Sequence, residues 1–176
     1  MNLVTKMDLP KRKSTRLKNY DYSQNGYYFI TICTHKKQKL LCNIVGEGLA
    51  PPEIVLSKYE KIINTQLLDL EKRYSCIKVD KFVIMPNHIH IILVIQNSGG
   101  ASPSPTISDI ICTLKSLTTR MSGLNPFWQR SFHDHIICSE QDYLKIWNYI
   151  DTNPQKWSED CFYIEQKKRD KRACFV

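Results

Sequence analysis

Two histidines lie two positions apart at the start of a strongly apolar, β-branched run. His88 and His90 follow a Met-Pro-Asn turn, and isoleucines make up most of the residues as far as position 95. Because side chains alternate between the two faces of a strand, both imidazoles are expected on one face, close enough to bind one metal ion. Ordinary hydrogen bonds from each ring to a neighbour are the alternative interpretation of this pair.

A tyrosine near the end of a predicted helix is a candidate nucleophile. Residues 140–152 carry apolar side chains at helical spacing, and Asn153-Pro154 ends the pattern. Tyr143 falls inside the apolar stripe, where packing explains it. Tyr149 lies on the flank of the stripe, and Asn153 follows it by one turn on the same side. A boundary tyrosine with its hydroxyl in water is the alternative.

A metal-binding histidine pair, a flank tyrosine and a basic chain together fit one reaction class. A phenolate can attack a backbone phosphate if a divalent cation polarises the phosphoryl oxygens. Asn153 could give that cation a third, neutral oxygen ligand. Imidazole and carbonyl oxygen together suit Mn²⁺ or Mg²⁺.

Composition favours a nucleic-acid partner in the cytoplasm. The 176 residues suffice for one domain, and the net charge of +8 with a pI near 9.1 favours a polyanion. No apolar run is long enough for a membrane span, and the basic N-terminus lacks the apolar region of a signal peptide. The seven cysteines form no C-x-x-C pair, so they are expected to be reduced packing residues.

The hydrophobic spacing predicts an α+β domain with one antiparallel sheet and helices packed on it, compatible with a ferredoxin-like arrangement. We expect a basic N-terminal arm at 1–26, a catalytic domain at 27–157 and a charged C-terminal tail at 158–176. The strands at 76–85 and 88–96 should be antiparallel neighbours because their connection is short. The other predicted elements are strands at 27–34, 40–45 (its hairpin partner) and 127–137, and helices at 55–73, 107–121 and 140–152.

Six segments, taken in order between about residues 14 and 157, resemble the REP-associated tyrosine transposases. These are relatives of the small single-tyrosine insertion-sequence transposases, in the HUH endonuclease superfamily. The segments are RLKNYDY (16–22), YFITICT (28–34), MPNHIH (85–90), KSLT (115–118), FWQRSF (127–132) and NYIDTNP (148–154).

The resemblance implies a ferredoxin-like fold that cuts and rejoins single-stranded DNA beside hairpins, through a covalent 5′-phosphotyrosine. It implies that His88 and His90 hold the metal, that Tyr149 is the nucleophile and that Asn153 is the third polar residue of the metal site. Two stretches depart from the family pattern. They are residues 155–160, whose path over the site is therefore open, and His133-Asp134, which with His135 reads as a surface or near-site cluster.

Single-stranded or hairpin DNA is the expected partner of a monomer or homodimer. Tyrosines 20, 22, 27 and 28 could stack on unpaired bases, although core packing explains Tyr28 equally well. A solvated tail or a solvated helix lysine is the alternative for the cations that could contact phosphates. These are Lys11, Arg12, Lys13, Arg16, Lys18 and Lys115.

Three functions of different classes follow from these residues. The first is a metal-dependent transesterase, or transposase, acting on single-stranded DNA. The second is a domesticated binder of hairpin nucleic acid that does not cut, and the third is a metal-dependent hydrolase in which water attacks. A covalent protein–DNA adduct would support the first and exclude the second, whereas free 5′-phosphate product without an adduct would favour the third.

Overall fold

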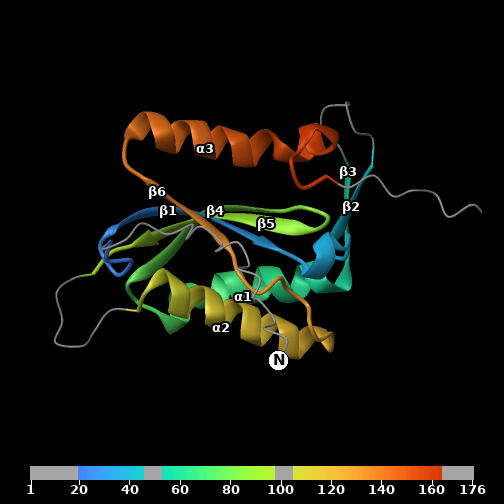
Figure 1. Cartoon of the computed structure of the whole chain (residues 1–176), viewed down its shortest axis with the longest axis horizontal. Coiled ribbons are helices and arrows are strands. Elements are labelled where there is room, and N and C mark those ends of the chain that lie inside the picture. Colours follow the sequence, from blue (N-terminus) through green and yellow to red (C-terminus); the bar gives the residue numbers. More distant parts are fainter. Residues whose placement is uncertain (1–19, 46–52, 98–104, 164–176) are drawn as a thin grey trace, which may run out of the picture.

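A four-stranded antiparallel sheet forms the centre of the computed structural model, which describes residues 20–45, 53–97 and 105–163. The strand order is β4-β5-β1-β6. Helices α1 and α2 cover one face of the sheet and α3 covers the other (Figure 1). The bounds are β1 Gly26–Cys33, α1 Lys58–Arg73, β4 Ile77–Ile84, β5 His88–Ile95, α2 Ile107–Ser122, β6 His133–Ile137 and α3 Glu140–Thr152.

The order of these elements is β-α-β-β-α-β, followed by α3. That order, with the first strand between the third and fourth strands of the repeat, is the ferredoxin-like arrangement. The predicted α+β ferredoxin-like fold is therefore confirmed. Within the described segments, no helix combines the length and the apolar character that crossing a bilayer demands.

All eight residues of β5 are buried, because helices cover both faces of this central strand. Ile89, Ile91, Leu93 and Ile95 belong to the larger core cluster, which includes residues of α1 and α2. The alternate positions turn toward α3, where Ile92 joins a smaller apolar cluster with the α3 side chains. His88 and His90 are in phase with Ile92, so the α3 face of the sheet carries both imidazoles.

Side-chain caps fix the start of each helix. Ser139 caps α3 through the amide of Asp142, and Thr106 forms a capping box with Asp109 at α2. The hydroxyl of Ser57 accepts from the amides of Tyr59 and Glu60, so α1 begins at Lys58. The prediction that this helix starts at residue 55 was wrong, because a short strand precedes it.

That strand, β3 (Glu53–Leu56), pairs with β2 (Cys42–Val45) in a separate two-stranded sheet. The segment 40–45 was expected to pair with the first strand, and that prediction was wrong. Between β1 and β2 the chain makes a 3₁₀ turn, η1 (His35–Lys37), in which Lys36 and Lys37 have positive φ angles of 53°. The turn directs the chain away from the sheet.

The predicted strand at 127–137 is regular only from His133 onward. Before it, the chain makes a single bridge between Thr34 and Trp128. The carbonyls of residues 129–131 instead accept hydrogen bonds from the ammonium of Lys115 on α2, at 2.5, 2.9 and 3.4 Å. Carbonyls used in this way are directed away from a strand ladder.

Candidate functional site

The two histidines lie side by side beneath α3. His88 is 0% exposed and His90 is 1% exposed, and their Nε2 atoms are 2.9 Å apart. Burial lowers the pKa of both rings to about 3, and Lys37 adds to the effect at His88. Both imidazoles are therefore neutral at neutral pH, which is the form that binds a metal ion.

Neighbouring polar groups orient the two rings. The Nδ2 of Asn87 donates to the carbonyls of Lys37 and Phe162, so its Oδ1 must accept. That Oδ1 lies 2.9 Å from Nδ1 of His88, which is accordingly the protonated nitrogen. Nδ1 of His90 lies 2.8 Å from the hydroxyl of Thr31, which can accept as well as donate. Both Nε2 lone pairs can thus be turned toward one ion.

Tyr149 reaches the same point from α3. Its Oη lies 3.3 Å from Nε2 of His90 and donates to Oδ2 of Asp160 at 3.2 Å. The side chain is 39% exposed, so the phenol lies at the border between the site and solvent. Partial burial raises the pKa of Tyr149 above its ordinary value, and the negative charge of Asp160 raises it further.

Asp160 is the site residue that the sequence analysis missed. It follows the short helix η2 (Asn153–Glu159), and its side chain is 1% exposed. Oδ1 accepts from the amide of Phe162 at 2.6 Å, and Oδ2 lies 3.8 Å from Nε2 of His88. One ligand atom from each of His88, His90 and Asp160 lies within 4.8 Å of the others. Two imidazoles and a carboxylate are a common ligand set for divalent metals.

One aromatic residue in the sequence marks the place where the chain folds back toward the sheet after α3. Trp157 is buried, and the centroid of its ring is 6.0 Å from that of His88. A tryptophan shortly after a helix-ending Asn-Pro could have indicated that the chain folds back over the sheet. The sequence predicts a charged tail from residue 158 onward, yet the described part of that segment, residues 158–163, contributes Asp160 to the cluster.

Asn153 lies beside Asp160. Its Nδ2 donates to Oδ2 of Asp160 at 3.0 Å, whereas its Oδ1 is buried without a partner among the described residues. Rotation of the amide by half a turn would exchange these two atoms and direct Oδ1 toward the cluster. A buried oxygen without a partner, next to two imidazoles and a carboxylate, fits a cation in this place.

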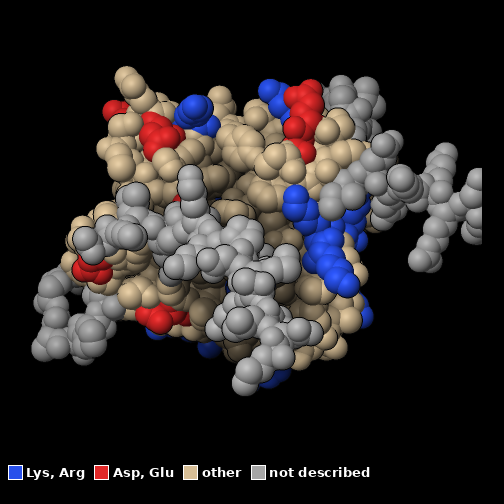
Figure 2. Space-filling view, in the orientation of Figure 1, with Lys and Arg blue, Asp and Glu red and all other residues tan. Residues whose placement is uncertain are grey.

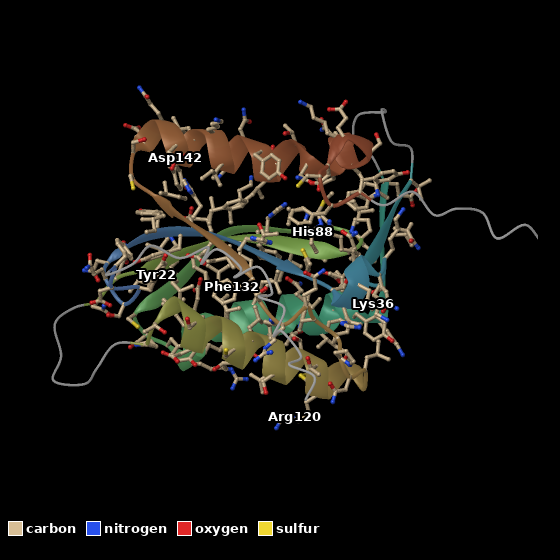
Figure 3. The ribbon with its side chains drawn as sticks, viewed as in Figure 1. Tyr22, Lys36, His88, Arg120, Phe132 and Asp142 are labelled. Atoms are coloured by element: carbon tan, nitrogen blue, oxygen red, sulfur yellow. The ribbon has the colours of Figure 1, made fainter. Side chains whose placement is uncertain are left out.

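The residues after Asp160 cover the histidine pair. The ring centroid of Phe162 is 4.6 Å from that of His88 and 6.1 Å from that of His90. The carbonyl of Phe162 is held by Asn87, and the ammonium of Lys37 lies 4.9 Å from its ring. Figure 3 shows His88 on the side of the sheet that faces α3 and η2.

The other candidate residues lie apart from this cluster. His135 is paired with Asp142 at 2.7 Å, and His133 approaches the site only through ring contact with Phe162 at 6.5 Å. Lys115 binds the three backbone carbonyls described above. The remaining predicted DNA contacts lie outside the described residues; they are Lys11, Arg12, Lys13, Arg16 and Lys18.

No family model matches the sequence. A protein of Haemophilus influenzae, itself uncharacterised, is 32% identical over 174 residues, which cover 88% of this chain and 94% of that one. A solved REP-associated tyrosine transposase bound to a REP hairpin superposes with a TM-score of 0.62 at 20% identity, over 81% of this chain and 74% of that one. A second solved chain, from Deinococcus radiodurans, superposes with a TM-score of only 0.46 at 18% identity, which is too low to support an inference. The chain therefore belongs to the family of the Haemophilus influenzae protein and has the fold of a REP-associated tyrosine transposase.

Proposed function

We propose that this protein is a metal-dependent transesterase, a transposase that cleaves and rejoins single-stranded DNA next to hairpins. The observation that carries the proposal is the position of Tyr149, whose Oη lies 3.3 Å from Nε2 of His90 and beside the cluster of His88, His90 and Asp160. A nucleophile placed against a cation site is the arrangement needed for attack on a phosphodiester.

Four side chains are the proposed holders of the cation. His88 and His90 would bind it through Nε2, and Asp160 through Oδ2. Asn153 would contribute Oδ1 after rotation of its amide. Bound Mn²⁺ or Mg²⁺ would polarise the phosphoryl oxygens and offset the charge that develops on them.

The covalent step would be carried by Tyr149. Its Oη forms a bond to phosphorus while the bond between phosphorus and the 3′-oxygen breaks, and that oxygen takes a proton from solvent water to leave as a 3′-hydroxyl. The phenol gives up its proton to solvent, because Oδ2 of Asp160, to which Oη donates at 3.2 Å, is the oxygen that would bind the cation. The resulting 5′-phosphotyrosine keeps the ester bond for rejoining to another 3′-hydroxyl.

A binder of hairpin nucleic acid that does not cut is the second candidate. The observation that favours it is the cover over the histidine pair, because Phe162 lies against both rings. In either case we propose that the protein works in the cytoplasm as a monomer or homodimer.

A denaturing gel separates the candidates. The full chain is incubated with Mn²⁺ and a DNA hairpin with single-stranded flanks, labelled at its 3′ end in one tube and at its 5′ end in the other. We expect the 3′ label to migrate with the protein and the 5′ label to appear on a free, shorter fragment. EDTA should suppress both products. Binding without any adduct would leave the non-cutting candidate, and a free 5′-phosphate fragment would mean attack by water.

A further inference from the structure

A second concave site lies on the opposite side of the sheet from Tyr149. It is a groove of about 1230 Å³ between α2 and the segment 123–132 that leads into β6. That volume exceeds the usual range for small-molecule pockets, roughly 300–1,000 Å³. An extended ligand therefore fits the groove better than a compact one.

The lining of the groove is cationic. Lys115, Arg120 and Arg130 belong to it, and no described lining residue is acidic. Arg120 and Arg130 are exposed, and Figure 3 shows Arg120 at the end of α2, on its side away from the sheet. The hydroxyls of Ser108, Ser116, Thr119 and Ser131 complete a lining that can bind phosphate oxygens.

We propose that this groove binds the phosphodiester backbone of the single-stranded DNA that flanks the hairpin. The inference rests on the proposed function and adds to it a path for the substrate. The groove would hold the strand at a distance from the chemistry, while Tyr149 acts on the other face of the sheet.

The groove is connected to the metal site through one strand of the sheet. In the segment that forms its floor, the amide of Gln129 donates to the carbonyl of Cys33 at 2.9 Å, and the carbonyl of Phe127 accepts from the amide of His35 at 2.8 Å. Cys33 is the register partner of His88. Because neighbouring strands lie about 4.8 Å apart, only β1 separates the groove floor from the backbone of His88.

This route favours a single strand over a duplex. A strand that leaves the groove must turn past the end of the sheet to reach the α3 face, and duplex DNA resists bending below about 150 bp. Figure 2 shows Lys and Arg side chains gathered at that end, where Figure 3 labels Lys36. These cations would continue the path from Arg120 and Arg130 toward His88.

The floor is built to hold a backbone and not to read bases. Phe127 and Trp128 are 1% and 5% exposed, so neither ring can stack on a base. The indole of Trp128 donates to Thr118 at 2.7 Å, and Lys115 fixes the carbonyls of residues 129–131 against α2. Arg120 and Arg130 remain available for phosphates.

Fluorescence anisotropy with the full chain tests the inference. The variants are Arg120→Gln, Arg130→Gln and their combination, and the matched control is Lys61→Gln, an exposed cation on α1. Two labelled probes are used, a hairpin with single-stranded flanks and the same hairpin with a blunt end. For the flanked probe we expect each arginine variant to lower the slope of log affinity against log salt by about 0.7–1. The double variant should bind it at least several-fold more weakly, and the blunt probe should be unaffected.

Each outcome decides the matter. Equal losses on both probes would assign the groove to the hairpin stem and overturn the single-strand path. A loss of the same size in Lys61→Gln would reduce the effect to overall charge, and unchanged binding in the double variant would exclude the groove. If the unaltered protein binds neither probe, the proposed function itself fails. Thermal unfolding shows that each variant is folded before its binding is compared.

Discussion

The hydroxyl of Tyr149 and Nε2 of His90 are 3.3 Å apart, although the two residues are separated by 59 positions in the chain. Packing of α3 on β5 fixes this distance, because Ile146 and Ile150 of α3 form one apolar cluster with Ile92. The histidine is two residues from Ile92 on the strand, and the tyrosine directly precedes Ile150 on the helix. The same apolar contact therefore positions the proposed nucleophile and the proposed metal site.

Replacing Tyr149 with Phe should abolish adduct formation and leave hairpin binding intact, because only the attacking oxygen is removed. Tyr143→Phe is the control: its hydroxyl donates to Asp80 at 2.6 Å, and it should keep cleavage activity with a modest loss of stability, about 1 kcal/mol. Both variants are compared for adduct on a denaturing gel. An adduct in Tyr149→Phe but none in Tyr143→Phe would identify Tyr143 as the nucleophile.

Loss of a proposed ligand should weaken metal binding in the absence of DNA. Titration calorimetry with Mn²⁺ should show no measurable binding in His88→Ala or His90→Ala. Asp160→Asn should bind about 10- to 100-fold more weakly, and Asn153→Ala should lose less because water can replace a neutral ligand. Glu159→Gln, next to Asp160 and exposed, should bind as the unaltered protein does. Normal Mn²⁺ affinity in Asp160→Asn would remove the carboxylate from the site.

The buried histidines should make the protein sensitive to acid. Each pKa is about 3 in the folded chain and near 6.5 when the chain is unfolded, so between these values the unfolded chain binds more protons. The free energy of unfolding should accordingly fall as pH decreases from about 6.5 to about 3, by at most about 1.4 kcal/mol per pH unit for each histidine.

Urea unfolding in EDTA at several pH values measures that slope. His88→Asn should reduce it, whereas His133→Asn, which replaces an exposed histidine, should leave it unchanged. Identical slopes in all three proteins would contradict the burial of a neutral imidazole at position 88.

The rate of adduct formation should rise with pH. Burial and the charge of Asp160 raise the pKa of Tyr149, so the phenol is protonated at neutral pH and its phenolate is scarce. Between pH 6 and 9 the single-turnover rate should increase by up to about tenfold per pH unit, since a shift of one unit changes the phenolate fraction tenfold. A rate that is flat over this range would mean that proton removal from Tyr149 does not limit the reaction.

Binding of hairpin DNA should weaken steeply as salt is raised. The net charge of +8 and the cations of the basic arm imply release of counterions from the DNA. Deletion of residues 1–18 should lower affinity and flatten the dependence on salt, as measured by anisotropy with the flanked hairpin. An affinity that is the same in low and moderate salt would contradict the assignment of a nucleic-acid partner.

The sequence predicted well those features that a local pattern determines. Alternation along β5 placed His88 and His90 on one face, and helical spacing separated Tyr149 from Tyr143 on α3. The helical spacing of residues 107–121 and the short connection between the strands at 76–85 and 88–96 likewise gave α2 and the β4–β5 pairing with nearly correct bounds. Each of these features depends on neighbours in the sequence, so the local residue pattern was sufficient to predict it.

Features that depend on contacts between residues far apart in the chain could not be predicted from the sequence. Asp160 reads as one charge among several, and only the contacts of Trp157 and Phe162 with the rings bring it back to the sheet. Likewise, Val55 and Leu56 fit a helical pattern, but their pairing with β2 and the cap at Ser57 decide for a strand. Lys115 read as a solvated or DNA-binding lysine, because nothing near it in the chain indicates three carbonyl partners.

The parts of the site are made in a fixed order as the chain leaves the ribosome. Thr31, Asn87 and the histidine pair emerge first, Tyr149 and Asn153 follow on α3, and Asp160 comes last. A nascent chain that has emerged only as far as β6 already contains all four strands of the sheet, but it lacks Tyr149. Such a chain contains the histidine pair and lacks Tyr149, Asn153 and Asp160, so the side chains that α3 and the residues after it contribute to the cluster are added only after the sheet is complete.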